Sequence, residues 1–385
     1  MMKYYIQLLQ GIISNFHLQL LFFFLCAFLT SLFLIPKIRA IAFKLNIQDL
    51  PGDRSSHSAP VPTFGGVAFY ISYILMLFFL QFFDESQLSL TLLASISILF
   101  FTGFLDDILN IPAKTKLLGQ FIGVALLMSQ PDFRILSLYG FMGVYEIPLV
   151  ASVAGSIFFL LAIINAFNLL DGIDGLTAIT GIIVAFFYSF MFYQLEYFYY
   201  LCISITTIAT LLAFLRFNLS EKRKIFMGDT GSLSIGLVLG LLTLKLMSSG
   251  SAGDIALNFD QKQLPLLLIA ILFVPILDLF RVMIIRALKG VSMFKPDRNH
   301  IHHIIVDFGF SHRKASFSIG VVNFSVALIM FYVIMNFNMV ASVFILVSIF
   351  VAGITLLFLM NKNKAALKLK IKIKILMLRM FFYIW

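Results

Sequence analysis

The chain has 385 residues, of which 61% are apolar, 15% are aromatic and only 12% are charged. Its mean hydropathy of +1.01 lies well outside the range of soluble domains, so the composition predicts a polytopic membrane protein. The formal net charge of +10 does not indicate nucleic-acid binding, because the basic residues gather on one side of the predicted membrane.

Apolar stretches of about 20 residues recur along the chain, and each is long enough to cross the hydrocarbon core as a helix. They predict an all-α, polytopic helix bundle in one transmembrane domain over residues 1–361. Cys26 and Cys202 fall inside spans, so neither a disulfide nor a thiolate metal site is expected. The eleven predicted spans are 17–36, 64–83, 87–105, 117–131, 148–166, 173–193, 197–217, 231–248, 264–286, 315–337 and 339–360.

The distribution of basic residues predicts the orientation. With the N-terminus outside, nearly all Lys and Arg residues fall on inward connections, and the exceptions are Lys3, Arg134, Lys245 and Lys262. The last segment, 362–385, alternates Lys with aliphatic residues and then becomes aromatic. It is predicted to be a cytoplasmic tail that lies on the anionic inner leaflet.

Five polar segments all come out on the cytoplasmic side of this topology, where loops on a rigid scaffold carry chemistry. In chain order they are DLPGDRSSHSAPVPTFGG (49–66), FLDDILNIPAKTK (104–116), NAFNLLDGIDGL (165–176), RFNLSEKRKIFMGDTGS (216–232) and FKPDRNHIHHIIVDFG (294–309).

Carboxylates recur at the ends of these spans. Each one alone could be a turn residue or a helix N-cap. Together they favour a bound cation, because closely placed carboxylates repel one another unless positive charge lies among them. Oxygen ligands and phosphate are the usual setting for Mg²⁺, with Mn²⁺ as a substitute, and Asn168 adds a neutral oxygen. The acids concerned are Asp106, Asp107, Asp171, Asp174 and Asp229.

Glycine pairs stand at the start of three spans, at 65–66, at 172 and 175, and at 228 and 231. Together they are compatible with phosphate binding at helix N-termini, whereas each glycine alone fits a turn or a close helix contact better. Lys114, Lys116 and Arg298 could supply the positive charge that phosphate chemistry needs.

The string RNHIHH places His300, His302 and His303 within four residues. A zinc site is one interpretation, but the string has no Cys partners and no HExxH pattern. A solvated loop with incidental histidines is a second interpretation. Imidazoles that donate to phosphate oxygens fit the surrounding acids and glycines better.

The ordered set DDILN, NAFNLLDGIDGL, FMGDTGS and RNHIHH resembles the polyprenyl-phosphate N-acetylhexosamine-1-phosphate transferase family, from about residue 49 to residue 310. Each motif alone is weak, whereas four in order are specific. The HIHH string is similar to the branch that transfers N-acetylglucosamine-1-phosphate to undecaprenyl phosphate. The resemblance implies a Mg-dependent enzyme in the bacterial inner membrane, with UDP-N-acetylhexosamine, undecaprenyl phosphate and membrane lipid as partners.

Roles for individual residues follow from the same resemblance. It implies that Asn168 and Asp229 bind Mg²⁺ and that Phe226 and Asp174 hold the uracil, while Asn165 is expected to contact substrate. The remaining catalytic candidates are Asp106 and Asp107 beside the reacting phosphates and Asp171 as a further acid, and the remaining substrate-binding candidates are Lys114, Lys116, Arg298, His300, His302 and His303.

The sequence also suggests alternatives to a transferase that uses N-acetylglucosamine. Ser55 or Ser56 stands where many members that use N-acetylglucosamine have a second basic residue, which leaves open another UDP-N-acetylated hexosamine. A transporter would also place carboxylates at the membrane edge, although no internal repeat is visible. A CDP-alcohol phosphotransferase would need an arginine and later acids that DGIDGLTAITG lacks. A homodimer is left open.

Overall fold

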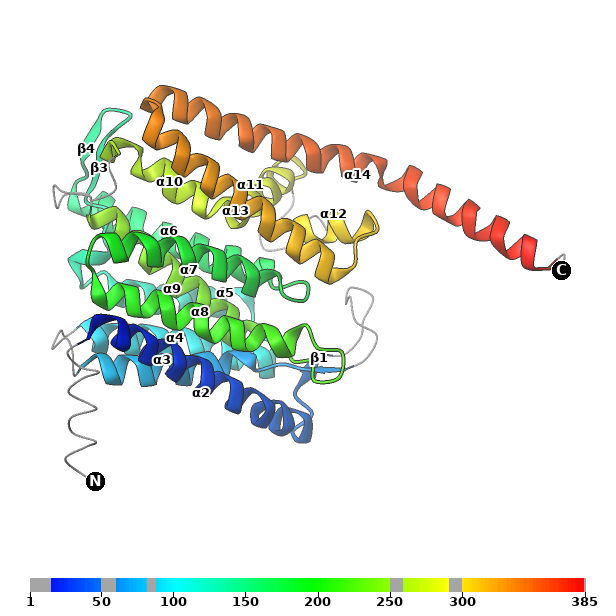
Figure 1. Cartoon of the computed structure of the whole chain (residues 1–385), viewed down its shortest axis with the longest axis horizontal. Helices are drawn as coiled ribbons and strands as arrows, with labels where there is room; N and C mark the ends of the chain where they lie inside the picture. The colour runs from blue at the N-terminus through cyan, green and yellow to red at the C-terminus, as the bar shows by residue number, and fades with distance from the viewer. Residues whose placement is uncertain (1–14, 50–59, 82–87, 250–258, 291–299, 384–385) are drawn as a thin grey trace.

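The computed structural model describes residues 15–49, 60–81, 88–249, 259–290 and 300–383, and most of its helices run side by side in one bundle (Figure 1). This confirms the all-α class. The long helices are α2 (Phe16–Lys44), α3 (Gly65–Leu80), α4 (Leu88–Leu109), α5 (Ala113–Leu127), α6 (Leu149–Leu170), α7 (Leu176–Gln194), α8 (Phe198–Asn218), α9 (Gly228–Ser249), α11 (Phe273–Leu288), α13 (His312–Asn336) and α14 (Met339–Tyr383). The shorter helices are η1 (Pro131–Phe133), η3 (Gln261–Gln263), α10 (Leu264–Ile271) and α12 (Ile301–Asp307).

The described residues also include two short antiparallel strand pairs. Strand β1 (Gln48–Asp49) pairs with β2 (Val61–Pro62), and β3 (Ser137–Phe141) pairs with β4 (Val144–Glu146). In Figure 1 the β3–β4 hairpin lies at one end of the bundle, whereas β1 and α12 lie at the other. The candidate site is at the end that holds β1 and α12.

Local sequence explains where several helices begin. Helices α5 and α6 each follow a proline, Pro112 and Pro148, whose fixed φ suits the entry into a helix. Helix α2 follows Asn15, whose side-chain oxygen accepts hydrogen bonds from the backbone N–H groups of His17 and Leu18 at 3.0 and 3.2 Å.

Each predicted span coincides with a helix, but the number of membrane crossings is not confirmed. Within the described ranges, eight helices are long and apolar enough to cross a membrane. The predicted spans 64–83 and 117–131 correspond to the shorter helices α3 and α5, of 16 and 15 residues. The predicted span 264–286 is split into α10 and α11, which are bent by 74°. The chain is a multi-pass membrane protein, and its two short helices account for most of the difference.

The break between α10 and α11 is stabilised by a side chain from another helix. Asn323 of α13 accepts a hydrogen bond from the Val274 backbone N–H at 2.9 Å and donates one to the Ile271 carbonyl at 3.0 Å. These are backbone groups on either side of the bend, and a buried break without partners for them would be costly. Asn323 therefore supports the direction in which α11 leaves the bundle.

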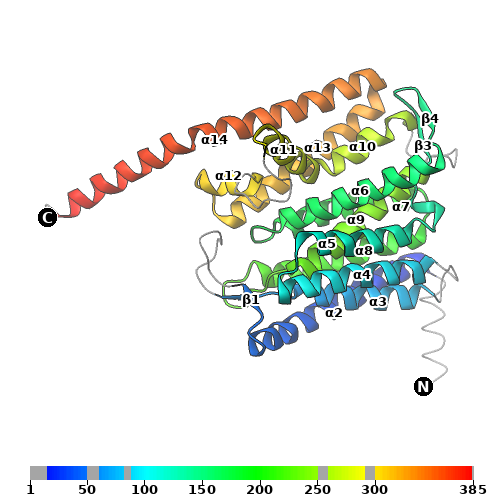
Figure 2. The ribbon, with the colours of Figure 1, turned by 180° about the vertical axis from the view of Figure 1, so that it is seen from behind.

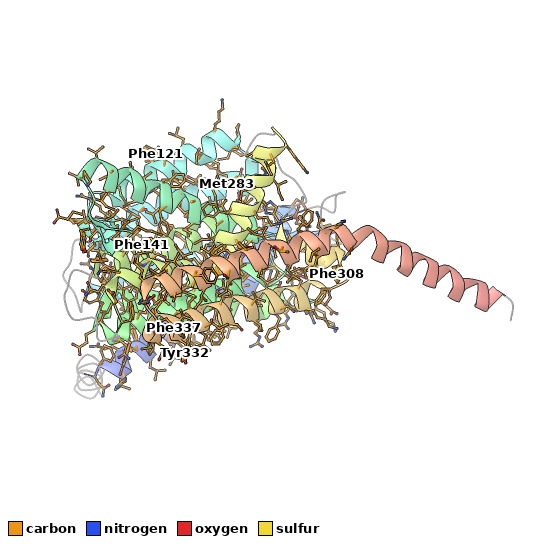
Figure 3. The ribbon with its side chains drawn as sticks, turned by 90° about the horizontal axis from the view of Figure 1, so that it is seen from above. Phe121, Phe141, Met283, Phe308, Tyr332 and Phe337 are labelled. Carbon is orange, nitrogen blue, oxygen red and sulfur yellow. The ribbon has the colours of Figure 1, made fainter. Side chains whose placement is uncertain are left out.

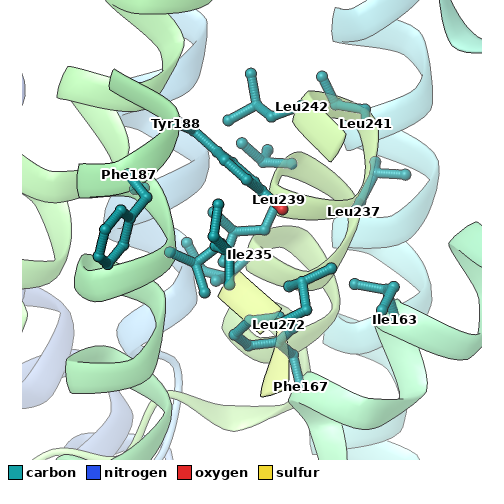
Figure 4. Packing of buried hydrophobic residues seen from close by; sticks show 14 of the residues in the cluster. Ile163, Phe167, Phe187, Tyr188, Ile235, Leu237, Leu239, Leu241, Leu242 and Leu272 are labelled. Carbon is teal, nitrogen blue, oxygen red and sulfur yellow. The ribbon is translucent and has the colours of Figure 1, made fainter. Parts of the chain in front are cut away.

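Helix α9 forms the centre of the bundle. It contacts α3, α4, α6 and α7, and most of its residues are buried. Figure 4 shows its aliphatic side chains, including Leu237 and Leu241, surrounded by Ile163 and Phe167 of α6 and Tyr188 of α7. Small residues allow this close packing, because a Cβ on Gly66 of α3 would overlap the backbone of Gly231. The first turn of α9 is consequently held by its neighbours.

The outer surface of the bundle is apolar. Phe121 and Tyr332 are 45% and 63% exposed and lie on opposite sides of the molecule in Figure 3. Exposed aromatic and aliphatic side chains over several helices are what a lipid-facing surface requires.

Helix α14 runs across the predicted boundary between 361 and 362 without a break and continues to Tyr383. Figure 2 shows its last part extending beyond the rest of the bundle, past the end that carries α12. The tail therefore continues a helix, and its placement on the inner leaflet stays a prediction.

Candidate active site

A cavity of about 470 Å³ lies where α4 and α6 end and α9 begins. Its lining comes from distant parts of the sequence, and all five predicted polar segments contribute to it. The lining residues are Gln48, Asp49, Thr63, Asp106, Asp107, Asn110, Asn168, Asp171, Gly172, Ile173, Asp174, Asn218, Phe226, Gly228, Asp229 and His303.

Oxygen atoms from three helices converge on the ammonium group of Lys116, which belongs to a fourth helix, α5. Lys116 Nζ donates to Asp106 Oδ2 at 3.1 Å and to Asn168 Oδ1 at 3.3 Å, and it also bonds the Asp229 carboxylate. Asn168 Nδ2 donates to Asp229 Oδ1 at 2.7 Å and to Ser232 Oγ at 2.9 Å, which turns the Asn168 oxygen toward Lys116. The arrangement is a cation position bounded by two carboxylates and one amide oxygen.

These residues fit a small divalent cation. Lys116 supplies positive charge at the oxygens of Asn168 and Asp229, which the family resemblance implies as Mg²⁺ ligands. Mg²⁺ takes only one or two protein carboxylates together with water and phosphate. Over the residues that the structure describes, no group of three or more His, Cys, Asp or Glu side chains could hold a metal ion. The donor set of two carboxylates and one amide oxygen consists of the oxygen ligands that Mg²⁺ prefers, and it includes no nitrogen or sulfur ligand.

The two neighbouring aspartates differ in their contacts. Asp107 accepts hydrogen bonds from the backbone N–H groups of Asp229 and Thr230 at 2.8 and 3.1 Å, and from the Thr230 hydroxyl. Asp107 thus caps the start of α9, whereas Asp106 faces Lys116. Gly228 makes the approach possible, because it has φ +70 and a Cβ there would lie 2.5 Å from Asp107 Oδ2.

The helix N-termini beside the cavity have internal partners for their N–H groups. Gly65 and Gly66 donate to the Phe226 and Met227 carbonyls at 2.9 and 3.0 Å, and Gly175 donates to Asn218 Oδ1 at 2.6 Å. These three N–H groups therefore hold the loops of the site together, and phosphate binding at the other glycines stays a prediction. For Gly65 and Gly66 the structure supports the interpretation as close helix contacts.

The other end of the cavity combines an aromatic ring with an ion pair. Lys224 Nζ donates to Asp174 Oδ2 at 2.6 Å and lies 5.4 Å from the centre of the Phe226 ring. His312 Nδ1 is 3.6 Å from the same carboxylate oxygen. Burial alone would raise the pKa of Asp174, but hydrogen bonds from His312 and Lys224 and their charge lower it below its usual value. Asp174 is therefore a carboxylate beside a flat ring.

Asp171 lies between these two ends. Burial, together with the negative charges of Asp229, Asp107 and Asp174, raises the pKa of Asp171 to about 8. At neutral pH its carboxyl group therefore keeps its proton when no cation is near.

The histidine segment meets the cavity through one of its three rings. His303 lines the cavity, while His300 and His302 are buried behind it, only 6% and 2% exposed. His302 packs against Gly172, where any Cβ would overlap its ring. Burial lowers the pKa of His302 well below its usual value, and His303, His300 and His312 lower it further. His302 is thus a neutral packing residue.

Some predicted site residues lie elsewhere. Asn165 does not line the cavity, and its amide donates to Gln120 Oε1 at 2.8 Å and to the Leu161 carbonyl at 2.7 Å, between α5 and α6. Lys114 is exposed on α5 and does not line the cavity either. Arg298 lies outside the described residues.

Other residues of the site were missed from the sequence. Lys224 and His312 contact Asp174, and Asp278 of α11 contacts His300. Lys224 stands two residues before Phe226 within a basic run, which was the one signal available for it. The other two come from segments far away in the chain, and nothing in their local sequence indicates the contact.

Comparison with known proteins agrees with this geometry. Residues 89–247 match the family described as Glycosyl transferase family 4. The chain is 30% identical, over 80% of its length and 82% of the relative's, to a protein of Mycobacterium tuberculosis named decaprenyl-phosphate N-acetylglucosaminephosphotransferase. It is 29% identical, over 78% and 81%, to a protein of Bacillus subtilis named probable undecaprenyl-phosphate N-acetylglucosaminyl 1-phosphate transferase. A protein of Salmonella typhi named undecaprenyl-phosphate alpha-N-acetylglucosaminyl 1-phosphate transferase is 30% identical over 74% and 78%.

The chain belongs to this family of polyprenyl-phosphate N-acetylhexosamine-1-phosphate transferases, as its four ordered motifs predicted. It is therefore an enzyme of the transferase class.

Proposed function

We propose that the protein transfers N-acetylglucosamine-1-phosphate from UDP-N-acetylglucosamine to undecaprenyl phosphate, giving undecaprenyl-diphosphate-N-acetylglucosamine and UMP. The names of its relatives support the transferred group and the lipid acceptor. The product would begin a cell-wall or surface polysaccharide at the cytoplasmic face of a bacterial inner membrane.

The observation that carries the proposal is the cation position between Asp106, Asn168 and Asp229. It shares one cavity with the ring of Phe226 and the carboxylate of Asp174. A nucleotide sugar needs both features, because its base requires a flat surface and a hydrogen-bond acceptor while its diphosphate requires positive charge. The cavity volume of about 470 Å³ is adequate for a ligand of this size.

In the proposed reaction an oxygen of the lipid phosphate forms a bond to the sugar-bound phosphorus of the nucleotide sugar. The bond between that phosphorus and the oxygen bridging it to UMP breaks, and UMP leaves with the oxygen. Mg²⁺, held by Asn168 and Asp229, would neutralise charge on the diphosphate. Both substrates are anions, so bringing their phosphates together is the main electrostatic difficulty.

The side chains of the chain have separate tasks in this reaction. Lys116 supplies positive charge to the reacting phosphates, and Asp106 holds Lys116 in place. Asp106 is a positioning group first and a proton acceptor second, because a phosphate monoester with a second pKa near ~6 is mostly ionised at neutral pH. Phe226 stacks with the uracil, and Asp174 accepts a hydrogen bond from it once Lys224 has moved aside.

The location of the site suits one substrate from water and one from lipid. The cavity lies at the end of apolar helices, with Asp106 near the end of α4 and Asn168 near the end of α6. The excess of basic residues on the same side supports a cytoplasmic location for this end. The reacting phosphates would then meet at headgroup depth while the prenyl chain stays among the helices.

The test is a transfer assay with purified protein in lipid, undecaprenyl phosphate and radiolabelled UDP-N-acetylglucosamine, with Mg²⁺ or EDTA. We expect label in the lipid phase, lost with EDTA and in Asp229→Ala. Transfer from a different UDP-N-acetylated hexosamine alone would keep the reaction and change the sugar. Absence of transfer from every nucleotide sugar would contradict the proposed reaction.

A further inference from the structure

The first two turns of α13 contact the loop that carries Asp174. His312 is the first residue of α13, and its Nδ1 lies 3.6 Å from Asp174 Oδ2. Ser316, one turn further along the helix, is fully buried, and its hydroxyl donates to the Asp174 backbone carbonyl at 2.6 Å. One end of α13 therefore contacts both the side chain and the main chain of Asp174, although the two segments are far apart in the sequence.

The same end of α13 contacts the loop that carries Phe226. Arg313 Nη2 donates to the Leu219 backbone carbonyl at 2.7 Å. Leu219 caps the C-terminal end of α8, where this loop begins. Helix α13 therefore supports two loops of the cavity wall, one with the carboxylate of Asp174 and one with the ring of Phe226.

The two loops are also bonded to each other. Asn218 accepts a hydrogen bond from the Gly175 N–H at 2.6 Å and donates one to the Ile225 carbonyl at 2.9 Å. Gly175 directly follows Asp174, and Ile225 directly precedes Phe226. A shift of either loop would therefore change the position of the carboxylate relative to the ring.

Helix α13 is anchored independently of these loops. A Cβ on Gly320 would lie 2.5 Å from a methyl carbon of Ile179 on α7, and Asn323 bonds the backbone at the break between α10 and α11. Lys224, which also bonds Asp174, stands instead in the segment between α8 and α9. In the proposed function the nucleotide base displaces Lys224, whereas the contacts from α13 stay in place.

We propose that His312 is a positioning residue for the nucleotide: with Ser316 it holds the Asp174 carboxylate in the direction in which it accepts the N–H of the uracil ring, and it thereby determines the preference for uracil over cytosine. The proposal rests on the proposed function, in which the base lies beside Asp174 and Phe226. At the ring position where uracil has this N–H, cytosine has only a nitrogen acceptor, so a firmly held carboxylate binds uracil and rejects cytosine. His312 does not line the cavity, and it acts through Asp174, which does.

The variant His312→Leu removes the contact with Asp174 and fills a similar volume. We expect the dissociation constant for UMP to rise about 10-fold, as when a hydrogen bond to a charged group is lost. The dissociation constant for CMP should change by less than about twofold, so that the preference for UMP falls. Isothermal titration of the purified protein in lipid nanodiscs with each nucleotide measures both constants. In the transfer assay KM for the nucleotide sugar should rise, and kcat should change by less than about twofold.

Three further variants separate this role from a purely structural one. His312→Asn should retain most of the affinity for UMP, because the Asn amide can donate from nearly the position of Nδ1. Lys314→Met is the matched control, since Lys314 is exposed on the same turn of α13, and it should bind UMP as the wild type does. In an Asp174→Asn background, His312→Leu should cause no further loss, because the carboxylate through which His312 acts is already gone.

Unchanged affinity of His312→Leu for UMP would overturn the proposal, and so would equal losses for UMP and CMP, which indicate a general structural role. If His312→Leu does not fold, Ser316→Ala takes its place, and the same comparison of UMP with CMP decides. A wild type that binds UMP no better than CMP would overturn both this proposal and the assignment of the base to this end of the cavity. If the wild type prefers UMP but transfers no sugar phosphate, the proposed reaction fails, and the preference for UMP in the variants still decides the role of His312.

Discussion

Lys116 Nζ lies 3.1 Å from Asp106 Oδ2, although the two residues belong to different helices, and the same ammonium group reaches Asp229. A lysine thereby supplies the positive charge that two close carboxylates need when no metal ion is bound. We propose that Lys116 and Mg²⁺ compete for the position between these oxygens.

Replacement of Lys116 by Met should strengthen the binding of a divalent cation. It removes a positive charge that competes for the oxygens of Asp106, Asn168 and Asp229, and we expect the affinity for Mn²⁺ to rise at least ~10-fold. Isothermal titration in the absence of substrate measures this. Sugar-phosphate transfer should fall in the same variant.

The matched control is Lys114→Met. Lys114 lies two residues earlier on the same helix, is exposed and does not line the cavity. It should leave the affinity for Mn²⁺ unchanged. If Lys116→Met bound Mn²⁺ no better than the wild type, Lys116 would not share a position with the cation.

The paired aspartates should give different phenotypes. Asp107 caps α9, so Asp107→Ala should lower the free energy of unfolding by about 1–2 kcal/mol, as the loss of other N-caps does. Asp106→Ala leaves that cap in place and should mainly lower the rate of transfer, because Lys116 loses a partner. Thermal melts and initial rates on both variants make the comparison. Equal stability losses in the two variants would contradict the capping role of Asp107.

The raised pKa of Asp171 predicts that the stability of the protein depends on pH. Its pKa is about 8 in the folded chain against an ordinary value of 3.8, so between these values the folded chain keeps a proton that the unfolded chain has released. Stability should therefore fall as the pH rises through this window, by up to about 1.4 kcal/mol per pH unit, and should level off above it.

Asp171→Asn should remove that dependence. In EDTA the variant should melt higher than the wild type at pH 8, by ~3 °C or more, and the difference should vanish near pH 4. Glu146→Gln, which removes an exposed carboxylate from the hairpin at the other end, serves as the control. Parallel melting curves for wild type and Asp171→Asn from pH 4 to 8 would show that Asp171 does not retain its proton.

Gly172→Ala should displace the histidine segment. An added Cβ would overlap the buried ring of His302, so α12 must shift and carry His303 away from the cavity. We expect transfer to fall at least ~10-fold, since small misplacements of site groups are costly. Gly155→Ala is the control, because a Cβ there has no neighbour within 4 Å and Ala favours the helix. A fully active Gly172→Ala enzyme would rule out a tight fit of His302 in this position.

Much of the fold was accessible from the sequence, because apolar length alone identifies helices in a membrane protein. The eleven predicted spans all coincide with helices. The bend after Leu272 was missed, since residues 264–286 read as one apolar stretch and the group that stabilises the break, Asn323, belongs to another helix. The continuation of α14 past the predicted end at 361 was also missed.

The sequence predicted which residue types form the site, but it predicted the roles of the individual residues less well. The motifs indicated that Asp106, Asn168 and Asp229 would lie in one site, and all three bond Lys116. The sequence could not distinguish Asp107 as a cap from Asp106 as a partner of Lys116, because adjacent residues on a helix point in different directions. The contacts of Asp278 and His312 could not be predicted from the sequence, since only tertiary packing brings these residues to the site.

The most direct test of the central claim follows the phosphorus atom. Wild-type protein is given undecaprenyl phosphate, Mg²⁺ and UDP-N-acetylglucosamine that carries radioactive phosphorus next to the sugar, and lipid and water phases are then counted. We expect the phosphorus label to enter the lipid, with one UMP released for each labelled lipid. Release of UDP, with the phosphorus label left in water and only the sugar in the lipid, would contradict it.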